Sequence, residues 1–169
     1  MNARLVAPAL AAVACAVPVS ASAHGVAKGP CSTGNVASTA SYRMALELGP
    51  QEEMYLPSEV KARHIKTGEI MLGGEMSMVD KAPGTRVFHL EVHVCTKSGA
   101  VVTRLEPRIV VNAAAMTSMK VPSAIMVGVG EPISDYHYGN DVALEPGARI
   151  TVRVTVKGQT ATFRARVPR

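Results

Sequence analysis

The residues best suited to chemistry in this sequence lie in the segment His-Leu-Glu-Val-His-Val-Cys, residues 89–95. His89, Glu91 and His93 alternate there with apolar residues, a pattern that predicts a β-strand with one face in a core, because successive strand side chains point to opposite faces. Neighbours on one face of a strand lie roughly 6.5–7 Å apart, so adjacent members of this row could bind one metal ion. The same row is typical of the solvent-exposed face of any β-sandwich strand. Other parts of the sequence must distinguish these two interpretations.

Methionines favour the metal site. The chain has nine of them, including the initiator. A methionine in a β-sheet core usually fills space, and Met44 and Met54 are interpreted in this way. The others cluster near turns and glycines: Met71, Met76, Met78, Met116, Met119 and Met126. Because a thioether suits copper, especially Cu(I), and imidazole suits either oxidation state, a methionine beside these histidines favours copper over zinc, calcium or magnesium.

The N-terminus has the features of a secretory signal peptide. Arg4 precedes an apolar stretch, residues 5–19, and the Ala-Ser-Ala sequence at residues 21–23 matches the small residues at which signal peptidase cleaves. We therefore expect residues 1–23 to be removed and the protein to be periplasmic or secreted. His24 would then be the first mature residue, offering an amine and an imidazole that chelate copper together. The alternative is that cleavage leaves an arbitrary residue at this position.

Export also defines the role of the cysteines. Cleavage removes Cys15, where lipidation is the weaker alternative, and leaves Cys31 and Cys95. Two cysteines in an exported protein most simply form one disulfide. That disulfide would attach the N-terminal arm, residues 24–40, to the end of the strand that contains the histidines. Seven extended residues span up to about 23 Å, so His24 would reach the polar face of that strand.

Alternating patterns in the remaining sequence predict an all-β sandwich. We expect strands at residues 42–48, 69–77, 87–96, 101–111, 117–121 and 124–129, followed by a final hairpin that turns at residues 157–158. With turns every 8–12 residues or so and no long helix, this spacing predicts about seven or eight strands in one domain, residues 41–169. The alternation assigns these residues to the core: Leu90, Val92, Val94, Val102, Ile109, Val111, Ile150, Val152, Val154 and Phe163.

The segments between the strands have weaker signals. Residues 58–63 are expected to form a short helical turn in which Ser58 is the cap. His64 follows between basic residues and is assigned to the surface. Residues 130–141 are expected to form a loop that contains His137.

The charges argue against a nucleic-acid partner. Removing Arg4 from the 18 basic residues leaves 17 against 13 acidic ones, so the mature net charge would be +4. The surplus lies mainly near the C-terminus, where basic residues alternate with apolar ones and predict the solvent-exposed face of a hairpin: Arg149, Arg153, Lys157, Arg164 and Arg166. An exported protein without tryptophan and with few aromatic residues lacks the platforms on which bases stack.

The order of three motifs resembles a known family. His-Leu-Glu at residues 89–91 is followed by Met126, then by His-Tyr-Gly-Asn-Asp-Val at residues 137–142, before a Pro-Gly turn. Over roughly residues 69–156, this order resembles the periplasmic iron-transport-associated family of copper-binding β-sandwich proteins. The resemblance implies an immunoglobulin-like or cupredoxin-like sandwich, and often a homodimer.

The resemblance also implies a copper site. Matched motif by motif, it assigns His89, Glu91, Met126 and His137 to that site. The family takes a further histidine ligand from a C-terminal extension, whereas no histidine follows His137 here. We expect His93 or His24 to replace it. Through the family's part in bacterial iron uptake, the resemblance implies iron as a second metal and an inner-membrane transporter or permease as a partner.

Three functions remain open at this point. The first is an exported protein that binds copper as Cu(II) or Cu(I), which would make it a binding protein rather than an enzyme. The second is a copper oxidase or polysaccharide-cleaving monooxygenase that uses His24, although the lack of tryptophan argues against a carbohydrate substrate. The third is a metal-free interaction module. The sequence contains no Gly-x-Ser-x-Gly elbow or phosphate-binding loop that would indicate a hydrolase.

Overall fold

The computed structural model of this protein describes residues 29–113 and 118–169. These residues form eleven strands, one α-helix and two 3-10 helices. The strands are β1 (Asn35–Ser38), β2 (Tyr42–Pro50), β3 (Met54–Tyr55), β4 (Glu69–Gly73), β5 (Arg86–Thr96), β6 (Arg108–Ala113), β7 (Met119–Val121), β8 (Ala124–Gly128), β9 (His137–Leu144), β10 (Arg149–Val156) and β11 (Gln159–Arg166). The helices are η1 (Pro30–Ser32), α1 (Pro57–Arg63) and η2 (Ile133–Asp135).

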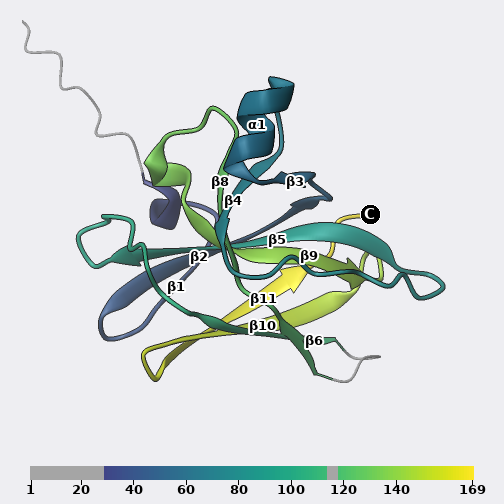
Figure 1. Ribbon diagram of the computed structural model, residues 1–169. Coiled ribbons are helices and arrows are strands. Elements are labelled where there is room, and N and C mark those ends of the chain that lie inside the picture. Colours follow the sequence, from purple (N-terminus) through teal and green to yellow (C-terminus); the bar gives the residue numbers. More distant parts are fainter. Residues whose placement is uncertain (1–28, 114–117) are drawn as a thin grey trace, which may run out of the picture.

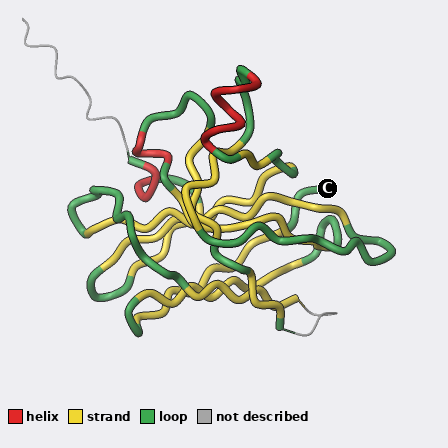
Figure 2. The backbone as a smooth tube through the Cα atoms, in the orientation of Figure 1, coloured by secondary structure: helices red, strands yellow, loops and turns green. Residues whose placement is uncertain are grey.

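The strands form two sheets, which confirms the predicted all-β sandwich. The larger sheet has seven strands in the order β1-β2-β5-β9-β8-β4-β3, and the smaller has four in the order β11-β10-β6-β7. Figure 1 shows the sheets as layers, with α1 on the side of the larger sheet that faces away from the smaller one. Little of the chain is helical (Figure 2). The structure has three strands that the sequence did not predict: β1 lies in the expected arm, β9 begins in the expected loop, and β3, with two residues, is too short to show a period.

The hydrophobic core lies between the two sheets. Residues of β5, β6, β10 and β11 that alternate along their strands meet there and are almost fully buried. Nine of the ten residues that we assigned to the core are buried in this way, and Val102 is only partly buried. Burying each such aliphatic side chain stabilises the fold by about 1.5–3 kcal/mol.

Val102 differs because the predicted strand 101–111 is shorter than expected. After an isolated bridge between Cys95 and Val101, the chain leaves the larger sheet and enters the smaller one only at Arg108, the start of β6. Arg104 has a positive φ of 59°, which no strand residue adopts. The loop is held by Tyr138, whose hydroxyl donates to the Val102 carbonyl (2.9 Å) and accepts from a backbone N–H of the loop.

The predicted loop 130–141 is wrong in its second half. Its last residues begin β9, and only the part that contains η2 lies outside the sheet. The prediction failed at Gly139. Glycine is common in turns, but this glycine lies in the middle of the sheet. A Cβ added at Gly139 would lie 1.7 Å from the carbonyl oxygen of Leu90, so the neighbouring strand approaches too closely for any side chain.

The short helix is close to its prediction. It begins one residue earlier than expected, at Pro57, which suits the first turn because proline has no N–H to donate. Ser58 is not the cap. Instead, the Glu59 carboxylate accepts a hydrogen bond from the Leu56 N–H (2.8 Å). His64 ends the helix and is exposed, as predicted.

The N-terminal arm contributes to the sandwich where it is described. Residues 35–38 form β1, which pairs with β2 as the edge of the larger sheet, so this part is not a free extension. The predicted disulfide between Cys31 and Cys95 is present and joins η1 to β5. The predicted signal peptide, His24 and Met116 lie outside the described residues. Within residues 29–113 and 118–169, no helix is long and apolar enough to cross a membrane.

The core assignment predicts the effect of a single substitution. Val92→Asp would bury an unpaired carboxylate at a fully buried position of β5, and we expect it to destabilise the fold by about 3 kcal/mol or more. Thr162→Asp places the same group on the exposed side of β11 and should change stability by less than about 0.5 kcal/mol. Urea unfolding followed by circular dichroism measures both. Equal tolerance at the two positions would show that the faces are assigned incorrectly.

Candidate metal centre

The candidate ligands share the outer face of the larger sheet. In the pairing of β5 with β9, His89 lies opposite Asp141, and in the pairing of β8 with β9, Met126 lies opposite His137. Directly opposite residues of antiparallel strands project from the same face of a sheet. The intervening residue Leu90 points into the core between the sheets. These four side chains therefore leave the sheet on the side away from the core.

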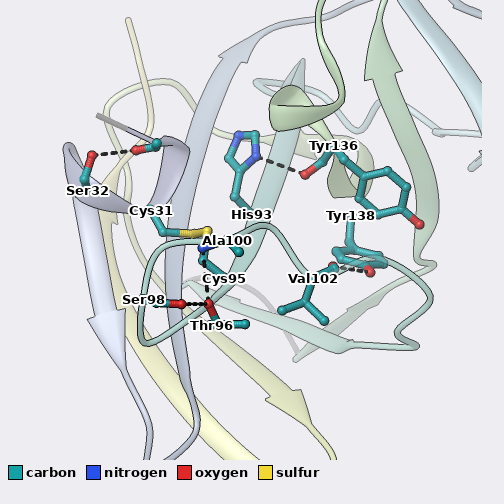
Figure 3. Close-up of a disulfide and its surroundings, with 11 residues drawn as sticks. Cys31, Ser32, His93, Cys95, Thr96, Ser98, Ala100, Val102, Tyr136 and Tyr138 are labelled. Carbon is teal, nitrogen blue, oxygen red and sulfur yellow. Dashed lines mark hydrogen bonds between the residues drawn. A yellow bond between two sulfur atoms is a disulfide. The ribbon is translucent and has the colours of Figure 1, made fainter. Parts of the chain in front are cut away.

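This outer face is covered rather than exposed to solvent. His89 and His137 are 0% exposed and His93 is 3% exposed, so this row is not the solvent-exposed strand face that was one of its two interpretations. The cover includes the segment with η2, because the backbone carbonyls of Asp135 and Tyr136 contact the rings of His137 and His93. Figure 3 shows the His93 ring turned toward the Tyr136 carbonyl. Period-two alternation identifies a face but carries no information about what packs on it.

Each of the three buried histidines has its Nδ1 atom held by a hydrogen bond. The partners are Asp141 Oδ1 for His89 (3.0 Å), Tyr136 O for His93 (3.2 Å) and Asp135 O for His137 (2.7 Å). A carbonyl oxygen only accepts, so the Nδ1 atoms of His93 and His137 must donate. In a neutral ring with its proton on Nδ1, the Nε2 atom carries a lone pair. Such an arrangement, with Nδ1 held by a carboxylate or carbonyl, is typical of histidines that bind metals through Nε2.

Three buried polar atoms on this face have no hydrogen-bond partner. They are His89 Nε2, His137 Nε2 and Glu69 Oε2. The last two are 3.5 Å apart, and one ligand atom from each of the three residues lies within 4.8 Å of the others. Leaving a buried polar atom without a partner costs about 1–3 kcal/mol. A cation bound by these atoms would remove that cost, so the three residues could hold a metal ion.

A second group of possible ligands shares His137 with the first. Glu91 and His93 each offer an atom within 4.8 Å of the His137 ring. The Glu91 carboxylate oxygen is 3.7 Å from His93 Nε2 and 3.8 Å from His137 Nδ1. Because His137 Nδ1 already donates to a carbonyl, this side of its ring has no lone pair for a metal. Glu91 and His93 therefore flank the first group instead of forming an equal one.

Met126 lies opposite His137 in the pairing of β8 with β9. Its side chain is fully buried, and its neighbour across the next pair of strands is Met71. Cβ atoms of such directly opposite residues are about 4.5–5.5 Å apart. The fold thus brings five of the predicted ligands to one face, and the sixth, His24, lies outside the described residues.

Two acidic residues of this site were not predicted from the sequence. Glu69, the first residue of β4, is 5% exposed, although nothing in a single sequence distinguishes it from a surface glutamate at a strand end. Asp141 was assigned to a loop, whereas it lies in β9 opposite His89. One signal could have identified it. A strand prediction for residues 137–142 would have placed His137 and Asp141 on one face, four residues apart.

The residues between His137 and Asp141 position the site. Gly139 allows β5 and β9 to approach closely. The buried Asn140 points to the opposite face, where its amide donates to the Glu75 carbonyl (2.7 Å) and accepts from the Ser77 N–H (2.9 Å). These bonds fix the segment that follows β4, the strand that begins with Glu69.

Burial dominates the electrostatics of the site. It raises the pKa of Glu69 to about 7, with a contribution from Glu91, whose own pKa is also raised by burial. Burial lowers the pKa values of His93 and His137, so both rings are neutral at pH 7. For His89, burial also disfavours the charged form, but its hydrogen bond to a carboxylate and the nearby negative charges outweigh that effect and raise the pKa.

Comparisons of this chain with protein-family models, with curated proteins and with solved structures found no match. Its chemistry has to be inferred from the donor atoms themselves. The face offers two imidazole nitrogens and a carboxylate oxygen without partners, and a thioether lies on the neighbouring strand. Such donors can hold a soft or borderline transition-metal ion.

The raised pKa of Glu69 predicts that metal binding releases protons. Below pH 7 this carboxyl group is mostly protonated, and a metal must displace that proton. Titration calorimetry in buffers of different ionisation enthalpy should detect about one released proton or more at pH 6.5, and fewer at pH 8.5. The variant Glu69→Gln should release less than the wild type at pH 6.5. Proton release that is independent of both pH and Glu69 would contradict this account.

Proposed function

We propose that this protein is exported to the periplasm or the extracellular space and there binds copper through His89, His137 and Met126. One observation carries the proposal: buried donor atoms without partners converge on one face of the larger sheet. In His89 and His137 the other ring nitrogen, Nδ1, is fixed by a hydrogen bond. The disulfide between Cys31 and Cys95 is compatible with export.

The donor set favours copper. Imidazole binds both oxidation states, a thioether favours Cu(I), and a carboxylate favours Cu(II). Met126 lies opposite His137 on the neighbouring strand, and the Glu69 carboxylate is 3.5 Å from His137 Nε2, so both kinds of donor lie beside this histidine. The site should therefore retain copper when its oxidation state changes. Glu91 supplies a further negative charge beside the rings.

Iron is the second candidate, and Glu69 favours it. Two histidines and one carboxylate are the donor set of many Fe(II) sites, and zinc also binds such a set. The motif order that resembles the iron-transport-associated family agrees with this candidate. In that case the protein would present its metal to an inner-membrane permease. Met126 distinguishes the two candidates, because a thioether contributes little to the binding of Fe(II).

The burial of the donors supports a binding protein over an enzyme. His89 and His137 are fully enclosed, whereas a monooxygenase that cleaves polysaccharides needs an open metal face with stacking residues around it. An enclosed site excludes water and large substrates and slows the loss of the ion. We therefore place binding and transfer of metal ahead of oxidation chemistry.

Titration of the mature protein with Cu(I), Cu(II), Fe(II) and Zn(II) tests the proposal. His89→Ala and His137→Ala should each weaken copper binding at least tenfold, or about 1.4 kcal/mol, because each removes a donor. His64→Ala is the matched control and should have no effect, since this histidine is exposed at the end of α1. Competition with chelators of known affinity measures each constant.

Two further substitutions identify the metal. Met126→Leu preserves the volume and should weaken Cu(I) binding while leaving Zn(II) binding almost unchanged. Glu69→Gln should weaken Cu(II) and Fe(II) binding more than Cu(I) binding. If Met126→Leu changes no constant while Glu69→Gln weakens Fe(II), iron replaces copper as the preferred ion. The metal-free interaction module becomes the better account if the wild type binds none of these ions stoichiometrically.

Asp141 should act by positioning His89. Asp141→Asn keeps a hydrogen-bond acceptor near Nδ1 but loses the negative charge, and such changes typically weaken metal binding about 10–100-fold. We expect weaker Cu(II) binding with an altered electron paramagnetic resonance spectrum, because the ring loses its fixed orientation. Asp80→Asn, at an exposed position, serves as the control. An unchanged spectrum and affinity in Asp141→Asn would exclude the positioning role.

A further inference from the structure

Charge is divided unequally between the two sheets. The strands of the smaller sheet contain no aspartate or glutamate, although they contain six basic residues: Arg108, Lys120, Arg149, Arg153, Arg164 and Arg166. The strands of the larger sheet contain four acidic residues, which are Glu47, Glu69, Glu91 and Asp141. One sheet is therefore basic, and the other holds the acidic residues of the candidate metal centre.

Four of the basic residues form one face, which we call the arginine face: Arg149, Arg153, Arg164 and Arg166. In the pairing of β10 with β11, Arg149 lies opposite Arg166, while Arg164 and Arg153 lie opposite threonines on the same face. All four side chains are exposed, since the residues between them point into the core. None of the ion pairs formed among the described residues includes these arginines.

Repulsion between these arginines costs stability, but their clustering offers a binding surface for anions. Like charges directly opposite each other, as at Arg149 and Arg166, destabilise an antiparallel pair of strands. The same arginines and Arg164 line a hollow of about 320 Å³ around Thr151. Three guanidinium groups around a hydroxyl are suited to phosphate oxygens, which accept hydrogen bonds from both.

Acidic residues also lie near the smaller sheet, at the edge away from β10 and β11. Glu75 and Glu106 line a second cavity together with Arg108 and Lys120, at the edge formed by β6 and β7. Their charges offset those of the two basic residues nearby. The uncompensated positive charge is therefore concentrated on β10 and β11.

We propose that the arginine face docks on an anionic phospholipid bilayer. A protein partner would need apolar anchors, because a few buried aromatic or aliphatic residues supply most of the affinity of protein interfaces. The large apolar side chains exposed among the described residues all lie outside the smaller sheet: Leu56, Leu72, Met76, Met78 and Ile133. A bilayer with anionic headgroups attracts clustered arginines through charge alone. The broad surface of β10 and β11, with threonines between the arginines, fits such a surface.

Docking in this way would orient the molecule. The candidate metal centre lies on the outer face of the larger sheet, and β10 and β11 lie on the other side of the sandwich (Figure 1). A molecule bound through the arginine face would direct His89 and His137 away from the lipid. The docking itself does not depend on the proposed metal binding.

Vesicle flotation tests the proposal with two variants of equal charge. The first, Arg149→Gln/Arg153→Gln/Arg164→Gln, removes three charges from the arginine face. The second, Lys66→Gln/Lys81→Gln/Lys97→Gln, removes three exposed charges from loops and turns elsewhere. Vesicles of phosphatidylcholine, with or without phosphatidylglycerol at 30 mol % or so, are used in 0.05 M salt and again in 0.3 M salt, where screening is stronger.

We expect the wild type to bind only vesicles with phosphatidylglycerol, and less at the higher salt concentration. The arginine variant should bind about tenfold or more weakly, and the lysine variant within about threefold of the wild type. Arg149→Lys/Arg153→Lys/Arg164→Lys keeps the charge and should bind, which excludes a folding defect as the cause. Equal losses in both glutamine variants, or no binding by the wild type, would overturn the proposal. So would displacement by millimolar inorganic phosphate at constant ionic strength, which would indicate a site for a soluble anion.

Discussion

The candidate metal centre depends on three hydrogen bonds that hold the Nδ1 atoms of buried histidines. Without them the rings could rotate or exchange tautomers, and no particular nitrogen would be presented to a ligand. With them, His89 and His137 each direct an unpartnered Nε2 atom into the protein. Such atoms are costly in a folded protein unless something binds them. Three such atoms occur close together here: His89 Nε2, His137 Nε2 and Glu69 Oε2. Their clustering is the strongest argument that these residues bind a ligand.

Strand β9 links this site to the rest of the fold. Along a few residues it provides His137 to the outer face, a glycine that allows β5 to approach, and Asp141, which holds His89. The residues that alternate with these point inward, where Tyr138 fixes the loop before β6 and Asn140 fixes the segment after β4. A change in the register of β9 would therefore disturb both faces together. The site and the core are specified by the same strand.

The sequence predicted the fold through period-two alternation, which is strong in β5, β10 and β11, where the alternating apolar residues reach the core. The resemblance assigned His89, Glu91, Met126 and His137 to one site, and the structure places their side chains on one face of the larger sheet. Alternation could not show that the outer face is covered, since a buried histidine and an exposed one look alike in a sequence. Glu69 was missed because it is brought to the site by sheet topology: β4 pairs with β8, which is far from it in the chain. Gly139 misled the prediction because close packing and turns both require glycine.

The central claim is that one copper ion is bound by His89 Nε2, His137 Nε2 and the Met126 thioether. X-ray absorption spectroscopy of the Cu(I)-loaded protein tests it most directly, with Met126→Leu as the matched sample. The account predicts one sulfur and two imidazole scatterers around a single copper, and loss of the sulfur contribution in the variant. A first shell of only nitrogen and oxygen in the wild type, or a sulfur contribution that persists in Met126→Leu, would contradict it.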